Sequence, residues 1–251
     1  MINKGDVVAL IGDFEPQSIV TLLRLIGLGA IIVPLTKETK NDHDYFFKSA
    51  GVDIVIDKGS TKRIRENQKD HKHLNILRGE NKPGLVLFST GTTGKPKAIL
   101  HDFTIFLKRF ENPRPTLKTL NFLFFDHIGG LNTLFHTIYN RGHVVATKDR
   151  SVENILTNCT QHKIELLPTT PTFLRLMLLG GFIPDKVPEA VSKFITSWNS
   201  SGGKYVTHDS YLSHDLLHLD AYIHITSPIR RLVDLLNIIV LQDKLGFLNL
   251  V

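Results

Sequence analysis

A nine-residue stretch of hydroxyl, glycine and lysine side chains is the part of the sequence best suited to bind phosphate. Glycines let backbone N–H groups converge on an anion, while hydroxyl groups add donors and lysines add positive charge. The spacing is not that of a Walker A loop, G-x-x-x-x-G-K-S/T. A polar turn between two strands is the alternative explanation. The candidate residues are Ser89, Thr90, Gly91, Thr92, Thr93, Gly94, Lys95 and Lys97, with Pro96 between the two lysines.

A second group of residues with possible chemistry is a set of histidines near the C-terminus. His214 and His218 are four residues apart, a spacing that places both on one face of a helix, and His208 and His224 flank them. Asp215 is a further possible ligand, but the spacing matches no zinc motif. We therefore predict no metal site here and interpret these histidines as surface or partly buried residues.

Strand-like and helix-like segments alternate over the first 180 residues and would position these groups. This alternation predicts a layered α/β fold with a largely parallel sheet and flanking helices. The pattern changes at Gly180-Gly181, so we predict one region at 1–181 and a small, mainly helical fragment at 182–251. Strands are expected at 7–11, 31–34, 52–56, 85–89, 120–125, 143–146 and 164–168, and helices at 17–28, 42–50, 130–139, 152–161 and 172–179. The charged stretch at 57–73 is expected to be an exposed loop or helix.

Composition and charge limit the class of protein and the cellular compartment that we expect. The 251 residues are 42% hydrophobic, enough for a globular core, and no apolar run is long enough to suggest a membrane span. The N-terminus lacks the pattern of a signal peptide, and the single cysteine, Cys159, allows no internal disulfide. We therefore expect a cytoplasmic protein without membrane contact. The net charge is +6, and residues 182–251 carry 6 Lys/Arg against 7 Asp/Glu, so the excess lies in the first region.

The string from Phe88 to Lys97, FSTGTTGKPK, resembles the phosphate-binding signature of the adenylate-forming superfamily. This superfamily contains AMP-forming acyl-CoA synthetases, luciferases and the adenylation domains of peptide synthetases. Ala98 stands where the family more often has glycine. The resemblance implies that the hydroxyl and glycine residues hold the phosphates of ATP with Mg²⁺, and that Lys97 adds charge nearby. It also implies a small carboxylic acid as substrate, with CoA as a further ligand in the full family.

Two more segments resemble the same superfamily and follow in the expected order. FFDHIGGLNTLFHTI places His127 and Gly130 in the His-x-x-Gly pattern, which implies a catalytic-site histidine near the reacting carboxylate. On its own, a histidine before a glycine pair is equally explained as the first residue of a helix. IELLPTTPTFLRLML is similar to the strand and helix that precede the adenine-binding motif, so the resemblance covers residues 1–180.

Several family motifs have no counterpart in this sequence. There is no Tyr-Gly pair for the adenine-binding Tyr-Gly-x-Thr-Glu motif, and neither the ribose-binding aspartate nor the catalytic lysine of the C-terminal domain has a match. Because adenylation depends on charge stabilisation by several groups together, their loss predicts little turnover. The expected function is a truncated ligase-like protein that binds ATP phosphates. The sequence predicts neither the acid nor the oligomeric state.

The segment AYIHITSPIRRLVDLLN, residues 221–237, is similar to the end of the RNB domain of ribonuclease II-type exoribonucleases. That resemblance implies an RNA phosphate contact for Arg230, an arginine role favoured by its fork of donors. A charge pair with Arg231 at the start of a helix is the alternative. Three readings therefore remain: an ATP-binding ligase-like chain, a weak RNA-binding or ribonuclease-derived fragment, and a fused reading frame without function.

Overall fold

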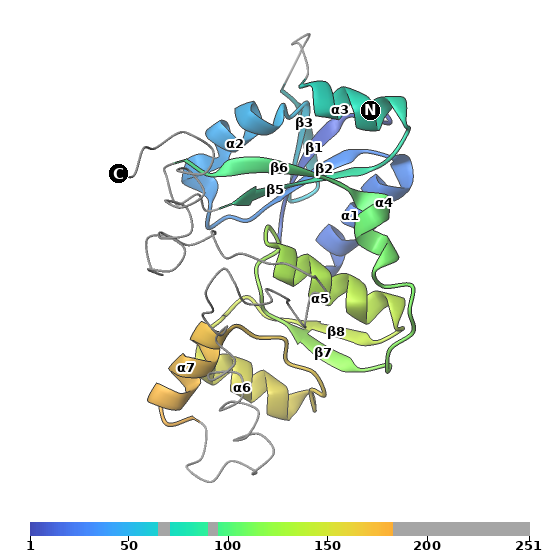
Figure 1. The fold of residues 1–251 in the computed structure, drawn as a ribbon. Helices are drawn as coiled ribbons and strands as arrows, with labels where there is room; N and C mark the ends of the chain where they lie inside the picture. The colour runs from blue at the N-terminus through green and yellow to red at the C-terminus, as the bar shows by residue number, and fades with distance from the viewer. Residues whose placement is uncertain (65–70, 90–94, 183–251) are drawn as a thin grey trace, which may run out of the picture. The chain divides into compact units, whose positions relative to one another are not determined.

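A six-stranded sheet with strand order β4-β3-β1-β2-β5-β6 is the centre of the fold (Figure 1). The four inner strands run parallel, and the two edge strands pair antiparallel with their neighbours. The computed structural model describes residues 1–64, 71–89 and 95–182. The strands are β1 (Val7–Ile11), β2 (Ile31–Leu35), β3 (Ile54–Asp57), β4 (Ser60–Arg63), β5 (Gly84–Ser89) and β6 (Lys97–Asp102).

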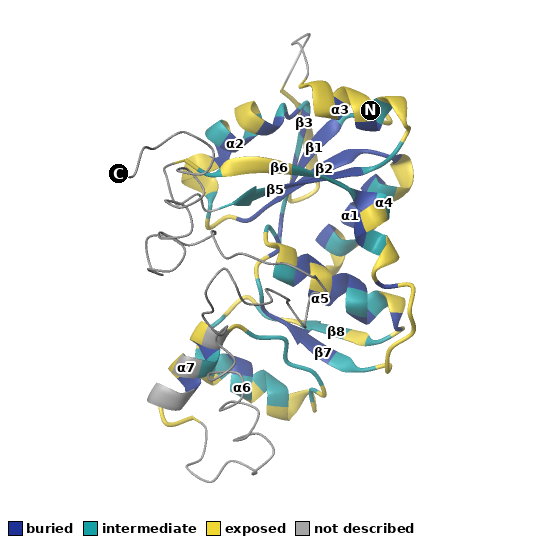
Figure 2. Ribbon diagram, viewed as in Figure 1, coloured by how far each residue is buried: buried dark blue, intermediate teal, exposed yellow. Residues whose placement is uncertain are grey.

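Helices cover both faces of this sheet, which explains why β1 and β2 are continuous apolar runs rather than alternating ones. Side chains of α1 (Pro16–Leu28) and α4 (Phe103–Lys108) pack with Val8 and Leu10 on one face. Side chains of α2 (His43–Ala50) and α3 (Lys72–Gly79) pack with Val7 and Ala9 on the other face. Figure 2 shows the buried strands between exposed helix surfaces. A short 3₁₀ helix, η1 (Lys40–Asp42), precedes α2.

A two-stranded parallel sheet follows, made of β7 (Lys118–Asn121) and β8 (His143–Ala146). Helix α5 (Ile128–Tyr139) connects them and buries Leu131, Leu134 and Phe135 in the same apolar cluster as α1 and α4. Helices α6 (Val152–Gln161) and α7 (Pro171–Leu179) complete the described part of the chain. Leu120, Ile155 and Phe173 belong to a separate apolar cluster that joins β7, α6 and α7.

The predicted layered α/β fold is confirmed, with several local differences. The edge strand β6 and the short helix α4 were not expected, and the strand expected at 120–125 is β7 at 118–121. The strand expected at 164–168 is a single bridge between Thr119 and Leu166, because the Glu165 carboxylate accepts the Lys118 N–H at 2.8 Å. The charged stretch at 57–73 contains the edge strand β4 and the start of α3 instead of a loop or a single helix. The mainly helical segment predicted at 182–251 lies almost wholly outside the described residues. Within the described ranges, no helix is long and apolar enough to cross a bilayer.

Candidate functional site

The candidate phosphate-binding residues lie where strand β5 turns back into β6. The two strands are paired over their full length, and Ser89 lies opposite Lys97 where the hairpin closes. Ser89 is half-buried, whereas Lys95 and Lys97 are exposed. Thr90, Gly91, Thr92, Thr93 and Gly94 lie outside the described residues. The structure therefore places the start and the end of the candidate loop on two adjacent strands.

Helix α2 holds the returning arm of this hairpin. The Tyr45 hydroxyl donates a hydrogen bond of 2.8 Å to the Pro96 carbonyl, and the Lys95 ammonium lies 5.2 Å from the centre of the Tyr45 ring. One residue further on, Phe46 stacks on Phe88 of β5 with 4.1 Å between the ring centroids. These contacts fix both arms of the hairpin to the same helix.

Lys95 and Lys97 are two exposed positive charges at the hairpin. Within the described part of the chain, no carboxylate forms an ion pair with Lys95 or Lys97. By contrast, Lys82 is paired with two carboxylates, at 2.9 and 3.1 Å. Exposed cations next to a glycine-rich stretch of sequence favour phosphate oxygens as ligands.

His127 begins helix α5, and its ring orientation is set by the backbone. Its Nδ1 accepts a hydrogen bond of 3.1 Å from the Gly129 N–H, as an N-cap residue does. The neutral ring therefore carries its proton on Nε2, and the side chain is exposed. This geometry agrees with the helix-start explanation, and it also leaves the Nε2–H able to donate to a substrate oxygen.

Steric crowding explains why position 130, the last of the His-x-x-Gly pattern, is a glycine. A Cβ atom on Gly130 would lie 2.1 Å from the Phe124 carbonyl oxygen and 2.9 Å from the Phe14 ring. Neither neighbour can retreat easily, because one is backbone and the other is a buried aromatic side chain. Gly130 thus allows the first turn of α5 to approach the segment that precedes it.

Asp126 connects this segment to the first sheet. The buried Thr36, which directly follows β2, donates a hydrogen bond of 3.0 Å to the Asp126 carboxylate. Burial raises the pKa of Asp126 above its ordinary value, and the hydrogen bond from Thr36 partly opposes this rise. Because β2 and β5 are neighbouring parallel strands, Thr36 and Ser89 lie at the same edge of the sheet. Ligands of open α/β sheets commonly bind at this carboxyl edge.

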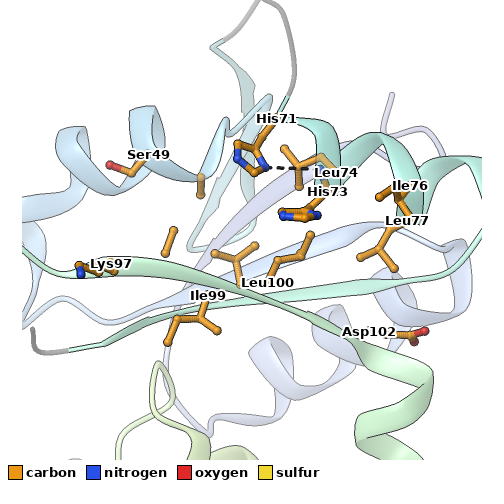
Figure 3. A pocket seen from close by; sticks show the side chains of 13 residues that line it. Ser49, His71, His73, Leu74, Ile76, Leu77, Lys97, Ile99, Leu100 and Asp102 are labelled. Carbon is orange, nitrogen blue, oxygen red and sulfur yellow. Dashed lines mark hydrogen bonds between the residues drawn. The ribbon is translucent and has the colours of Figure 1, made fainter. Parts of the chain in front are cut away.

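A separate groove of about 740 Å³ lies between β6 and α3 (Figure 3). Lys97 lies at one end of the groove and Asp102 at the other, with Leu74 and Leu77 of α3 facing Leu100 of β6. Asp102 is already engaged, because it caps α4 and pairs with Lys82. The lining is mainly apolar, and its polar side chains besides Lys97 include His71 and His73 at the start of α3.

The remaining predicted residues are not tested by the geometry. Arg230 lies outside the described residues, as do His208, His214, Asp215, His218 and His224. Within the described ranges, no three His, Cys, Asp or Glu side chains cluster as they would to hold a metal ion.

Three features of the site were missed in the sequence. Asp126 precedes His127 directly and follows an apolar run, a position that could have drawn attention to it. Thr36 could have been found as the polar residue at the end of a predicted strand. Tyr45 carried no signal, because its partner is a backbone carbonyl 51 residues away.

Comparisons with solved structures show the same fold in adenylate-forming proteins. The N-terminal subdomain of Klebsiella oxytoca NpsA superposes with a TM-score of 0.57 at 17% identity, covering 70% of this chain and 51% of that one. The o-succinylbenzoate CoA synthetase of Bacillus subtilis, bound to its acyl-adenylate intermediate, gives a TM-score of 0.53 at 18% identity, covering 75% and 54%. The chain thus spans about half the length of these structures.

Curated relatives are large peptide synthetases. The nonribosomal peptide synthetase tcpP of Claviceps purpurea is 24% identical over 283 residues, which cover 91% of this chain and 13% of the synthetase. Bacitracin synthase 1 of Bacillus licheniformis is 24% identical over 111 residues, covering 39% of this chain and 2% of the synthetase. Neither synthetase supports the ribonuclease resemblance of residues 221–237. The model of the family described as "AMP-binding enzyme" matches residues 2–219, which is most of the sequence, and the chain therefore belongs to this family.

Proposed function

We propose that this chain binds ATP with its phosphates at the β5–β6 hairpin, and a small carboxylic acid beside His127. The observation that carries the proposal is the meeting of two groups at one edge of the sheet. The hairpin brings the exposed Lys95 and Lys97 to the end of β5, and the Thr36–Asp126 bond ties the His127 segment to the end of the neighbouring strand β2. An anion and its reaction partner can therefore meet there.

The chemistry that this site would support is carboxylate adenylation. A carboxylate oxygen attacks the α-phosphorus of ATP, pyrophosphate leaves with the electrons of the broken P–O bond, and an acyl-adenylate forms. Lys95 and Lys97 would stabilise the charge on the phosphate oxygens. The Nε2–H of His127 would donate to an oxygen of the acid and orient it. Mg²⁺ would accompany the phosphates, and CoA is the acceptor that the acyl-CoA synthetases of the family imply.

Binding of Mg·ATP is the first test, measured by isothermal titration calorimetry on the full chain. Lys97→Ala should weaken the affinity about tenfold or more, because a charge-assisted hydrogen bond contributes about 1.5–3 kcal/mol. Lys62→Ala is the matched control, since Lys62 is also an exposed lysine on an edge strand, at the far side of the sheet. Equal affinities for the Lys97→Ala and Lys62→Ala proteins would refute phosphate binding at the hairpin.

Adenylation itself is read by ATP–pyrophosphate exchange with a panel of carboxylic acids. His127→Asn removes the imidazole but keeps a side-chain oxygen that can cap α5. His136→Asn changes a histidine at the other end of the same helix and serves as its control. Exchange that falls only in His127→Asn would support the role of His127. Exchange that is equal in both variants would refute that role and leave the ATP site intact.

A further inference from the structure

We propose that Arg150 is a positioning residue that holds the segment 122–127 against the end of β1 and thereby fixes the place of the His127 ring. The inference rests on the proposed function, because only a substrate at that edge makes the place of His127 matter. Arg150 lies in the connection between β8 and α6, outside the phosphate-binding string and the His-x-x-Gly pattern.

The guanidinium of Arg150 joins three separate parts of the chain. Its Nη2 donates to both carboxylate oxygens of Asp13, each at 2.8 Å, and its Nε donates to the Phe122 carbonyl at 2.6 Å. Asp13 follows β1 and is 137 residues away in the sequence. The two side chains are only 16% and 22% exposed, so water screens the pair less than it screens a surface ion pair.

Aromatic contacts hold the same segment from both sides. The Arg150 guanidinium carbon lies 4.8 Å from the centre of the Phe124 ring. The next residue, Phe125, is fully buried and meets Phe14 edge-to-face, with 5.2 Å between the centroids. Because Phe14 directly follows Asp13, the chain after β1 contacts the segment directly through the ring pair and, at the adjacent position, indirectly through the Asp13–Arg150 pair.

The segment is tied at both of its ends. Arg150 binds its first residue, Phe122, and Thr36 binds Asp126, next to His127. Asp13 follows β1 and Thr36 follows β2, and these two strands are direct neighbours in the sheet. A segment that is fixed at two points to adjacent strand ends has little freedom to move the residue that follows it.

Arg150 is poorly placed to bind phosphate itself. Its Nε and Nη2 donate to protein oxygens within 2.8 Å, and Nη1 has a longer contact of 3.5 Å with the Lys148 carbonyl. A phosphate would have to displace the Asp13 carboxylate. The hairpin lysines form no ion pair among the described residues, which separates the role of Arg150 from theirs.

Hydrogen exchange on the full chain without nucleotide tests this inference. Arg150→Gln should make the amides of 122–130 exchange about tenfold faster or more, since hydrogen bonds to charged groups contribute about 1.5–3 kcal/mol. The NMR signals of the His127 ring should shift as well. Arg63→Gln is the control, because it breaks an ion pair of equal length, 2.8 Å to Asp6, elsewhere in the fold. Both readouts should be unchanged at 122–130 in the control.

Asp13→Asn provides a second, milder variant in case Arg150→Gln does not fold. The double variant should exchange no faster than Arg150→Gln alone, since the change at Asp13 acts on the segment through Arg150. Arg150→Lys should recover part of the protection. The inference is overturned if 122–130 exchanges at the wild-type rate and the His127 signals stay in place in either folded variant, or if the two effects add. A failure of ATP binding would leave these readouts unaffected, so the two proposals fail independently.

Discussion

Replacement of Gly130 by alanine should destabilise the protein, although alanine is the better helix former. The added Cβ would lie 2.1 Å from the Phe124 carbonyl oxygen and 2.9 Å from its carbonyl carbon, far inside van der Waals contact. Overpacking of this kind costs about 1–3 kcal/mol or more, and the contact with backbone places it near the upper end. Helix propensity returns at most about 1 kcal/mol. We therefore expect a net loss of about 2 kcal/mol in the free energy of unfolding.

Gly129→Ala is a matched control in the same helical turn. Its Cβ would meet only side-chain atoms, Leu123 Cδ1 at 3.2 Å and His127 Nδ1 at 3.3 Å, which can yield by a few tenths of an ångström. The gain in helix propensity should then roughly offset the steric cost of the added Cβ, so the free energy of unfolding should change by less than about 1 kcal/mol.

Urea denaturation followed by circular dichroism measures both variants. A loss of about 2 kcal/mol in Gly130→Ala also corresponds to a melting temperature lower by roughly 4–8 °C for a domain of this size. Wild-type stability of Gly130→Ala, or a larger loss in Gly129→Ala, would refute the steric explanation of the His-x-x-Gly glycine.

Three further changes test other parts of the site and the core. Burial raises the pKa of Asp126 above its ordinary value of 3.8, so the free energy of unfolding falls as pH rises through the folded pKa of this carboxyl. The Asp126→Asn protein should therefore gain stability relative to wild type from about pH 4 upward, with a slope of at most about 1.4 kcal/mol per pH unit. The asparagine oxygen can still accept the hydrogen bond from Thr36. Parallel pH dependences of unfolding would contradict this. Tyr45→Phe removes the hydrogen bond to the Pro96 carbonyl and should lower the free energy of unfolding by about 0.5–1.5 kcal/mol. It should also weaken Mg·ATP binding in calorimetry, and wild-type affinity would argue against anchoring of the hairpin by Tyr45. Phe135→Ala, at a side chain that is 1% exposed, should cost about 3–5 kcal/mol in urea unfolding, and a loss under 1 kcal/mol would contradict its core position.

Much of the fold could be predicted because burial leaves a clear pattern in the sequence. The parallel strands β1 and β2 are unbroken apolar runs between turn residues, and α6 begins after Ser151, whose side chain caps it. The edge strand β4, whose sequence is STKR, has no apolar residue and so carried no such signal. Its pairing with β3 becomes visible only in three dimensions.

The candidate site was predictable in its local parts and not in its long-range contacts. The glycine-threonine hairpin and His127 stand in short, distinctive strings. Arg150 and Asp13 are 137 residues apart, and the sequence around each residue does not identify the other as its partner. Thr36 and Asp126 are 90 residues apart and meet only because two strand ends and a helix start converge.

The position of Arg150 in the chain has a consequence for synthesis on the ribosome. All six strands of the first sheet are complete at Asp102, whereas the residue that binds the end of β1 is made 48 residues later. At about 5–20 residues per second, this delay is roughly 2–10 s, long compared with the folding of many domains. The nascent sheet would hold Asp13 without its arginine during that interval. The His127 part of the candidate site would therefore form after the sheet that carries the hairpin lysines.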